Sequence, residues 1–332
     1  MVDSVTLKHA GGDLDLPVTG ATEGASGFAI GSLMKETGLV TLDAGFTNTA
    51  SCTSAVTYID GDEGILRYRG YPIEQLAEKS SFVETSYLLI YGELPTESQL
   101  GQFEERIQRH TLLHEDLKRF FDGFPRDAHP MPVLSSAVSA LSTFYPGSLN
   151  PFDAEQVELS TVRLLAKLPT IAAYAHRKSL GQPLLYPDNR LGLVENFTRL
   201  AFGNPAEDYE LDPVLVKALD QLFVLHADHE QNCSTSTVRL VGSGQANMFA
   251  SVSAGIHALS GPLHGGANSA VLDMLEMIKN SDDDVDTFVT KVKNKEKGVR
   301  LMGFGHRVYK NYDPRAAIVK KTADEEIGRA HV

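Results

Sequence analysis

The alternation of apolar and polar residues predicts two β-hairpins near the start of the chain. The first hairpin places the alternating segments 5–7 and 14–16 on either side of Gly11-Gly12, a pair that favours a turn. The second places the apolar segments 56–59 and 65–68 on either side of the turn-forming residues 60–64. We therefore expect residues 1–70 to form a β-rich segment.

From about residue 71 onward, apolar residues recur at helical spacing. Thr96 with Gln99 forms a capping-box pattern, and Asp212-Pro213 is typical of a helix start. Pro72 is expected at a first helical position, and Pro169 is expected to interrupt the helix that follows Asp153. Further helices are expected at about 244–259, 266–280 and 284–294. The predicted fold class is mainly α, with two helical domains and a small N-terminal β-rich segment.

Length and composition narrow the function class. A chain of 332 residues is long for one core, so one large and one smaller domain are expected. The formal net charge of −13 argues against nucleic acid as a partner. Cys52 and Cys233 are too few for a disulfide framework and fit a reducing compartment. No apolar run reaches membrane-spanning length, so we expect no membrane partner and a cytoplasmic location.

Two histidines, His264 and His306, lie in glycine-rich turns rather than on apolar helical faces. The first turn reads Gly-Pro-Leu-His-Gly-Gly-Ala-Asn over 261–268, and the second reads Met-Gly-Phe-Gly-His-Arg-Val-Tyr over 302–309. Glycine lets backbone approach a ligand closely, and imidazole transfers protons near neutral pH. The pair therefore indicates acid–base chemistry on a ligand held by backbone. The simpler alternative is that both are surface loop residues.

A second histidine pair, His226 and His229, lies at the end of the helix predicted after Asp212. A spacing of three would place both on one helical face, which raises zinc as an alternative, with Cys233 as a further ligand. The order His-x-x-His-Glu matches no zinc-protease motif, and no second cluster has metal-ligand spacing. We therefore predict no metal site. His226 is interpreted as an interior histidine bonded to backbone, and His229 as the better ligand-binding candidate.

Two further motifs are weaker. Residues 242–247 begin like a dinucleotide fingerprint, but they lack its final glycine and follow no clear strand. The hydroxyl residues 234–237 have no nucleophile elbow around them, so helix capping is the preferred interpretation.

The motif Asp313-Pro314-Arg315 predicts a helix start with a cation in the first turn, which the helix dipole opposes. A carboxylate held by the Arg315 guanidinium would remove the conflict. The alternative is an exposed arginine that reaches water. Nearby basic residues form either a field suited to phosphates or a solvated face, and they are Lys291, Lys293, Lys295, Lys297, Arg300, Arg307 and Lys310.

The histidine turns, together with segments 68–73 (Tyr-Arg-Gly-Tyr-Pro-Ile) and 225–232 (Leu-His-Ala-Asp-His-Glu-Gln-Asn), resemble the citrate synthase family. The likeness continues through Asp313-Pro314-Arg315 to about Glu326 and is closest to the longer bacterial, hexamer-forming (type II) branch. It implies a citrate-synthase-like two-domain helical fold. It also implies an acyltransferase that condenses acetyl-CoA with oxaloacetate and releases citrate and CoA, the entry step of the tricarboxylic acid cycle.

The resemblance also implies residue roles. His264 would hydrogen-bond the thioester oxygen of acetyl-CoA, and His306 would polarise the ketone of oxaloacetate. His229 and Arg315 would bind oxaloacetate. The segments that follow acetyl-CoA would include Leu263, Gly303 and Phe304. Acetyl-CoA is a substrate, so no cofactor is expected.

The chain departs from the family at the general base. The family's aspartate lies in an Asp-Phe-Tyr-Ser/Thr-Gly type string beyond the second histidine, and no such string is present in the 332 residues. We therefore expect an incomplete and inactive enzyme. Its expected parts are residues 71–265 as a large helical domain without its C-terminal helices, 266–326 as an incomplete small domain and 327–332 as a non-native tail.

Regulation, assembly and donor choice are further expectations from the resemblance. Arg109, Tyr145, Arg163 and Lys167 match positions of an NADH site in some relatives. Ala206 and Asp188 depart from that site, so weak or absent NADH sensitivity is expected. The full-length protein is expected to form a homo-oligomer, either a dimer or a hexamer. The alternatives are a 2-methylcitrate synthase that uses propionyl-CoA, a non-catalytic homologue and, more distantly, a metal hydrolase.

Overall fold

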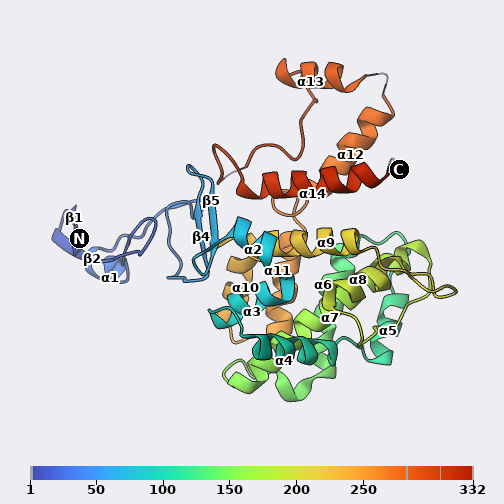
Figure 1. Ribbon diagram of the computed structural model, residues 1–332. Coiled ribbons are helices and arrows are strands. Elements are labelled where there is room, and N and C mark those ends of the chain that lie inside the picture. Colours follow the sequence, from blue (N-terminus) through green and yellow to red (C-terminus); the bar gives the residue numbers. More distant parts are fainter. Residues whose placement is uncertain (1–2, 282, 307, 331–332) are drawn as a thin grey trace.

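The computed structural model describes residues 3–281, 283–306 and 308–330, with side chains described through Asp324. The described chain is mainly helical (Figure 1). The first group of helices comprises α1 (Leu33–Thr37), α2 (Ile73–Lys79), α3 (Phe82–Tyr91), α4 (Glu97–Gln108), α5 (Glu115–Asp122), α6 (Pro130–Phe144) and the 3₁₀ turn η1 (Pro146–Ser148). The second comprises α7 (Ala154–Leu180), α8 (Leu193–Phe202), α9 (Pro213–Leu225), α10 (Cys233–Ser243), α11 (Met248–Leu259), α12 (Ala267–Lys279), α13 (Val285–Lys293) and α14 (Pro314–Ala330).

Two small antiparallel sheets occupy the N-terminal part, as the alternation predicts. The first sheet contains β1 (Ser4–His9), β2 (Gly12–Thr19) and β3 (Gly27–Phe28), and the second contains β4 (Thr57–Asp60), β5 (Ile65–Tyr68) and β6 (Tyr71–Pro72). In the β4–β5 hairpin, Thr57 pairs with Tyr68 and Asp60 pairs with Ile65. Leu66 and Tyr68, two residues apart, are both buried and point to the same face.

The largest apolar core surrounds α7, which packs against α6 and α8. Pro169 was expected to interrupt this helix, and that prediction is wrong, because α7 continues through it from Ala154 to Leu180. Proline removes one backbone hydrogen bond and costs about 3 kcal/mol in a helix interior. Ile171 and Tyr174, just beyond the proline, are fully buried. Burial of such side chains offsets that cost.

Three helix boundaries also differ from the predictions. Pro72 ends β6 and is the N-cap of α2 rather than its first residue. α9 ends at Leu225, so His226 is its C-cap and His229 lies in the connection to α10, rather than both lying on one helical face. The helix expected at 244–259 begins at Met248, because the Asn247 side chain accepts a hydrogen bond from the Ala250 amide and caps it there. The capping box at Thr96 and the helix starts at Asp153 and Asp212 are confirmed.

Helix α14 brings the C-terminal part of the described chain back against α2 and α9. α14 contacts α2 and α9, and it lies between the large helical body and the α12–α13 pair (Figure 1). The β4–β5 hairpin stands beside the N-terminal end of α14. Hence the α9–α10 connection, the segment before α14 and the hairpin meet at one place. In the part of the chain that the structure describes, no helix is long and apolar enough to cross a membrane.

Candidate active site

Three aromatic side chains from two distant segments meet in front of α14. His229 comes from the α9–α10 connection, and His306 and Tyr309 come from the segment between α13 and α14. The ring centroids of His229 and His306 are 5.4 Å apart, and the Tyr309 ring lies 5.6 Å from His229 and 4.8 Å from His306. The fold thus brings together two of the histidines that the sequence singles out, which are 77 positions apart.

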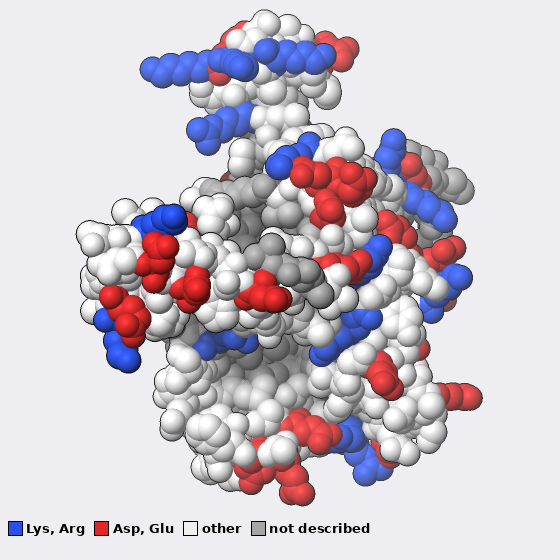
Figure 2. Space-filling model, turned by 90° about the vertical axis from the view of Figure 1, so that its left-hand side faces the viewer, with Lys and Arg blue, Asp and Glu red and all other residues white. Residues whose placement is uncertain are grey.

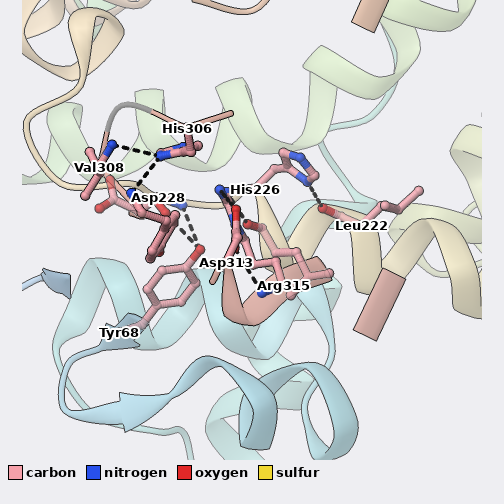
Figure 3. A network of polar contacts seen from close by, with 10 residues as sticks. Tyr68, Leu222, His226, Asp228, His306, Val308, Asp313 and Arg315 are labelled. Carbon is pink, nitrogen blue, oxygen red and sulfur yellow. Dashed lines mark hydrogen bonds and ion pairs between the residues drawn. The ribbon is translucent and has the colours of Figure 1, made fainter. Parts of the chain in front are cut away.

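Backbone amides set the tautomer of His306. Its Nδ1 accepts hydrogen bonds from the amides of Val308 (3.0 Å) and Tyr309 (3.2 Å), as Figure 3 shows for Val308. A nitrogen that accepts two N–H groups carries no proton, so the hydrogen-bond pattern assigns the ring proton to Nε2. Partial desolvation and the nearby Arg315 guanidinium lower the pKa of His306. His306 is therefore a neutral donor through Nε2.

His229 is more deeply placed. Burial, reinforced by Arg315 and His306, lowers the pKa of His229 to about 4. Its Nε2 atom is buried, and no described group hydrogen-bonds to it. A buried polar nitrogen without a partner is costly, and a ligand that bonds to it removes this cost. His229 is therefore a neutral imidazole with one free ring nitrogen.

Arg315 lies at the start of α14 and already holds a carboxylate. Its Nε bonds Asp313 Oδ1 at 3.0 Å, and its Nη2 bonds Asp313 Oδ2 at 2.8 Å (Figure 3). Burial alone would raise the pKa of Asp313, but the bonds from Arg315 outweigh it and lower that pKa. The carboxylate expected beside Arg315 is thus its neighbour Asp313 in the ligand-free chain. The pair shows that this guanidinium can bind a carboxylate with two bonds.

His264 lies beside the start of α10, close to the connection that carries His229. It lies in the turn between α11 and α12, and its Nε2 is 2.8 Å from the Ser234 hydroxyl at the start of α10. Ser234 is five residues after His229, so one short segment contacts both His264 and the His306 cluster. No contact between His264 and His306 themselves is among those of the described residues.

Two glycines shape the segment before His306. Gly303 and Gly305 have φ values of +82° and +83°, a left-handed backbone that side chains resist. A Cβ on Gly303 would also lie 2.8 Å from the Val271 side chain on α12. Between them Phe304 is 75% exposed, and Leu263 beside His264 is 84% exposed. The segments expected to follow acetyl-CoA thus present two apolar side chains to solvent.

Of the four residues expected at a regulatory site, three form one cluster. The Arg163 guanidinium lies 4.0 Å and the Lys167 ammonium 5.5 Å from the centre of the Tyr145 ring. Lys167 donates to the carbonyl groups of His110 (2.7 Å) and Leu112 (2.5 Å). Burial and the Arg163 charge lower the pKa of Lys167 to about 8. Arg109 is instead exposed and pairs with Glu105.

The alternatives raised from the sequence gain no support. His226 is exposed rather than interior, and its Nδ1 bonds the Leu222 carbonyl, so it turns away from His306 (Figure 3). Among the described residues, no group of three or more His, Cys, Asp or Glu side chains could hold a metal ion. Residues 242–247 begin within the last turn of helix α10 rather than after a strand, unlike a dinucleotide-binding turn.

At least two of the basic residues near the site are held in ion pairs. Figure 2 shows long basic side chains at the top of the molecule, where α13 lies, while acidic side chains predominate over the middle of that face. Lys291 and Lys310 are paired with Asp283 and Asp62. Arg307, which was expected among them, lies outside the described residues, as do the last two positions of the expected tail.

Sequence reasoning missed several residues that complete the site. Ser234 was assigned to helix capping, whereas Asn232 caps α10 and Ser234 contacts His264. Tyr309 ends the second histidine turn, but the sequence analysis gave it no role, because its ring contacts with His229 and His306 arise only in the folded chain. Asp313 was predicted as a cap, and its bidentate bond to Arg315 follows only from the folded geometry.

Comparisons with known proteins agree on one family. The family model for the citrate synthase C-terminal domain matches residues 45–331. Citrate synthase 1 of Mycobacterium tuberculosis (strain H37Rv) is 70% identical over 98% of this chain and 76% of its own length. Citrate synthase of Corynebacterium glutamicum is 60% identical over 97% of this chain and 74% of its own.

Solved structures extend the likeness to the fold. Citrate synthase from Pyrobaculum aerophilum is 37% identical with a TM-score of 0.74, covering 86% of this chain and 71% of that one. Citrate synthase from Thermoplasma acidophilum, in a ternary complex with carboxymethyl coenzyme A and oxaloacetate, is 29% identical with a TM-score of 0.79. That match covers 87% of this chain and 74% of that one. The mainly helical fold predicted from the sequence is confirmed.

Proposed function

Because the chain belongs to the citrate synthase family, we propose that its histidine site serves the condensation of acetyl-CoA with oxaloacetate to give citrate and CoA. The observation that carries this proposal is the contact between the His229 and His306 rings beside Arg315. The Arg315 guanidinium can bind one carboxylate of a small dicarboxylic ketoacid, and the two neutral imidazoles can donate to its ketone and to a further oxygen.

In this proposal the ketone oxygen of oxaloacetate accepts a hydrogen bond from His306 Nε2. The two amide bonds to Nδ1 favour the tautomer that can donate there. The donor is in place before the reaction, so it stabilises the negative charge that develops on this oxygen without reorganisation. Arg315 binds one carboxylate of oxaloacetate in place of Asp313, and the unpaired Nε2 of His229 donates a further bond.

His264 acts on the second substrate. Removal of a proton from the methyl group of acetyl-CoA leaves an enolate, and a hydrogen bond to its oxygen lowers the barrier. The Ser234 hydroxyl can donate to His264 Nε2, which leaves Nδ1–H as the donor to the thioester oxygen. We further propose that Leu263, Gly303 and Phe304 lie along the bound acetyl-CoA. Their exposure leaves them accessible to a ligand.

The general base is a separate part of the proposal. Neither the Asp-Phe-Tyr-Ser/Thr-Gly string of the family nor a similar one occurs in the 332 residues. We predict that the 332-residue chain binds oxaloacetate but forms no citrate, and that a chain which also carries this string forms it. The assay is oxaloacetate-dependent release of the CoA thiol. Equal rates from both chains would overturn the prediction.

The names of the relatives favour acetyl-CoA over propionyl-CoA, since those relatives are citrate synthases. The proposed reaction needs no resident cofactor or metal, because the acyl donor is itself a substrate. We propose a homo-oligomer and, from the resemblance to the longer bacterial branch, assignment to that branch. At the Tyr145 cluster we predict weak NADH binding, because Asp188 is an acid at a position where the NADH-binding relatives have a base, and an acid there would oppose a phosphate.

Calorimetric titration with oxaloacetate tests the site directly. Arg315→Lys keeps the charge but loses the two-pronged geometry, so we expect binding to weaken by roughly tenfold or more. Arg190→Lys is the matched control, because Arg190 also forms two bonds with a nearby aspartate, Asp188, outside the site. Equal affinity for oxaloacetate in both variants would contradict the proposed role of Arg315.

A further inference from the structure

A single β-hairpin contacts both loops that carry the imidazoles of the site. The hairpin consists of β4, β5 and the turn 60–64 between them. It precedes His229 and His306 in the chain by about 170 and 240 positions, respectively, and no family motif of the site includes its turn. Its side chains reach the His229 loop, and its turn meets the His306 loop through backbone and through the ion pair between Asp62 and Lys310.

The first contact is made by Tyr68, which is fully buried. Its hydroxyl donates to the Asp228 carbonyl oxygen (2.9 Å) and accepts from the Asp228 amide (3.3 Å), and the Val224 carbonyl oxygen lies 3.2 Å away (Figure 3). Asp228 directly precedes His229. One phenol therefore ties both backbone polar groups of the residue before His229 to β5.

Thr57 on β4 makes the second contact. Its hydroxyl donates to Asp228 Oδ2 at 2.5 Å, and the same oxygen accepts from the Glu230 amide at 3.0 Å. Glu230 has a φ of +49°, a left-handed conformation that costs free energy for a residue with a side chain. The Asp228 carboxylate thus stabilises a strained turn on the other side of His229, and Thr57 orients that carboxylate.

The third contact fixes the loop of His306. The Lys310 amide donates to the Gly61 carbonyl oxygen at 2.9 Å. A Cβ on Gly61 would lie 2.6 Å from the Val308 carbonyl carbon and closer still to its oxygen, so only glycine allows this approach. Val308 is also the residue whose amide bonds His306 Nδ1. The turn therefore sets the position of the backbone that orients the His306 ring.

We propose that the β4–β5 hairpin positions His229 relative to His306, and that Tyr68, Thr57 and Gly61 are its positioning residues for oxaloacetate binding. The choice of oxaloacetate as the ligand rests on the proposed function, whereas the role of the hairpin in holding the two rings rests on the contacts described above. None of the three residues touches the substrate. They act through the two loops, whose imidazoles must keep one separation to bind the same small molecule.

The test uses the full 332-residue chain and the variants Tyr68→Phe, Thr57→Val and Gly61→Ala. Matched controls are Tyr174→Phe, which removes a buried hydroxyl bonded to the Leu185 carbonyl, and Gly31→Ala, whose Cβ would meet nothing within 4 Å. NMR signals of the histidine rings are recorded without ligand, together with melting temperatures and the dissociation constant for oxaloacetate.

We expect each hairpin variant to shift the signals of His229 and His306, whose rings lie in contact, and to weaken oxaloacetate binding by roughly tenfold, as for loss of one buried hydrogen bond. Tyr174→Phe should lower the melting temperature comparably and leave both signals and the affinity unchanged. Thr57→Val, at a half-buried position, provides the folded variant if Gly61→Ala does not fold.

The proposal is overturned if the hairpin variants retain wild-type signals for both rings, or if Tyr174→Phe shifts them equally. Absence of oxaloacetate binding in the unsubstituted chain would instead contradict the proposed function. The ligand-free ring signals would still decide the role of the hairpin.

Discussion

Acidification should destabilise the folded chain through His229. Burial beside Arg315 and His306 lowers the pKa of this imidazole from 6.5 to about 4. Between these two values the unfolded chain binds a proton that the folded chain does not, so the free energy of unfolding falls as the pH falls. The full lowering corresponds to roughly 3 kcal/mol. Integrated from pH 7.5 to pH 5, His229 alone should remove about 2 kcal/mol of stability.

The assay is urea denaturation followed by far-UV circular dichroism at several pH values, for the unsubstituted chain and for His229→Gln. Other groups also titrate in this range, so the informative quantity is the difference in the free energy of unfolding between the unsubstituted chain and His229→Gln. That difference should change by about 2 kcal/mol between pH 7.5 and pH 5, with the variant losing less stability. His226→Gln, which removes an exposed histidine three positions away, is the control. Parallel pH profiles for the unsubstituted chain and His229→Gln would refute the argument that His229 is buried and neutral.

Three further predictions concern other parts of the molecule. Ser234→Ala should shift the NMR signal of the His264 ring and leave oxaloacetate affinity unchanged, because the Ser234 hydroxyl bonds the ring of His264 and not the ring of His229 or His306. Burial lowers the pKa of Lys167 from 10.5 to about 8, so between these values the unfolded chain binds a proton that the folded chain does not, and the free energy of unfolding should rise with pH. In urea denaturation, Lys167→Met should show a smaller rise over this pH range. Leu141→Ala, at a fully buried position in the core around α7, should lower the free energy of unfolding by about 2–5 kcal/mol, whereas a loss below about 1 kcal/mol would contradict the packing of that core.

The sequence predicts local features of this fold well where one residue type has one dominant conformational role. The Thr96 capping box and the hairpin around residues 60–64 depend on neighbours within a few positions, and both are confirmed. Pro169 was misjudged because its local cost is offset by burial along α7, which depends on helices distant in sequence. Tertiary packing outweighed propensity at that position.

The candidate site was also only partly predictable from the sequence. His229, His306 and Arg315 could be identified from motifs, because glycines surround His306, the segment 225–232 around His229 matches the family, and the helix dipole opposes the cation at Arg315. Their proximity could not be worked out from spacing, since it depends on α14 returning to α2 and α9. Tyr68 was part of a recognised segment, but its buried bonds to Asp228 join positions 160 residues apart, and no local pattern encodes them.

The central claim is that His229 and His306 together hold oxaloacetate. It is tested most directly by NMR of chains with isotope-labelled histidine, assigned by single His→Gln variants, during titration with oxaloacetate. The signals of His229 and His306 should shift along one saturation curve, while that of the exposed His226 stays in place. The account would be contradicted if oxaloacetate bound saturably without shifting the NMR signal of either ring, or if the signals of the two rings shifted with different midpoints.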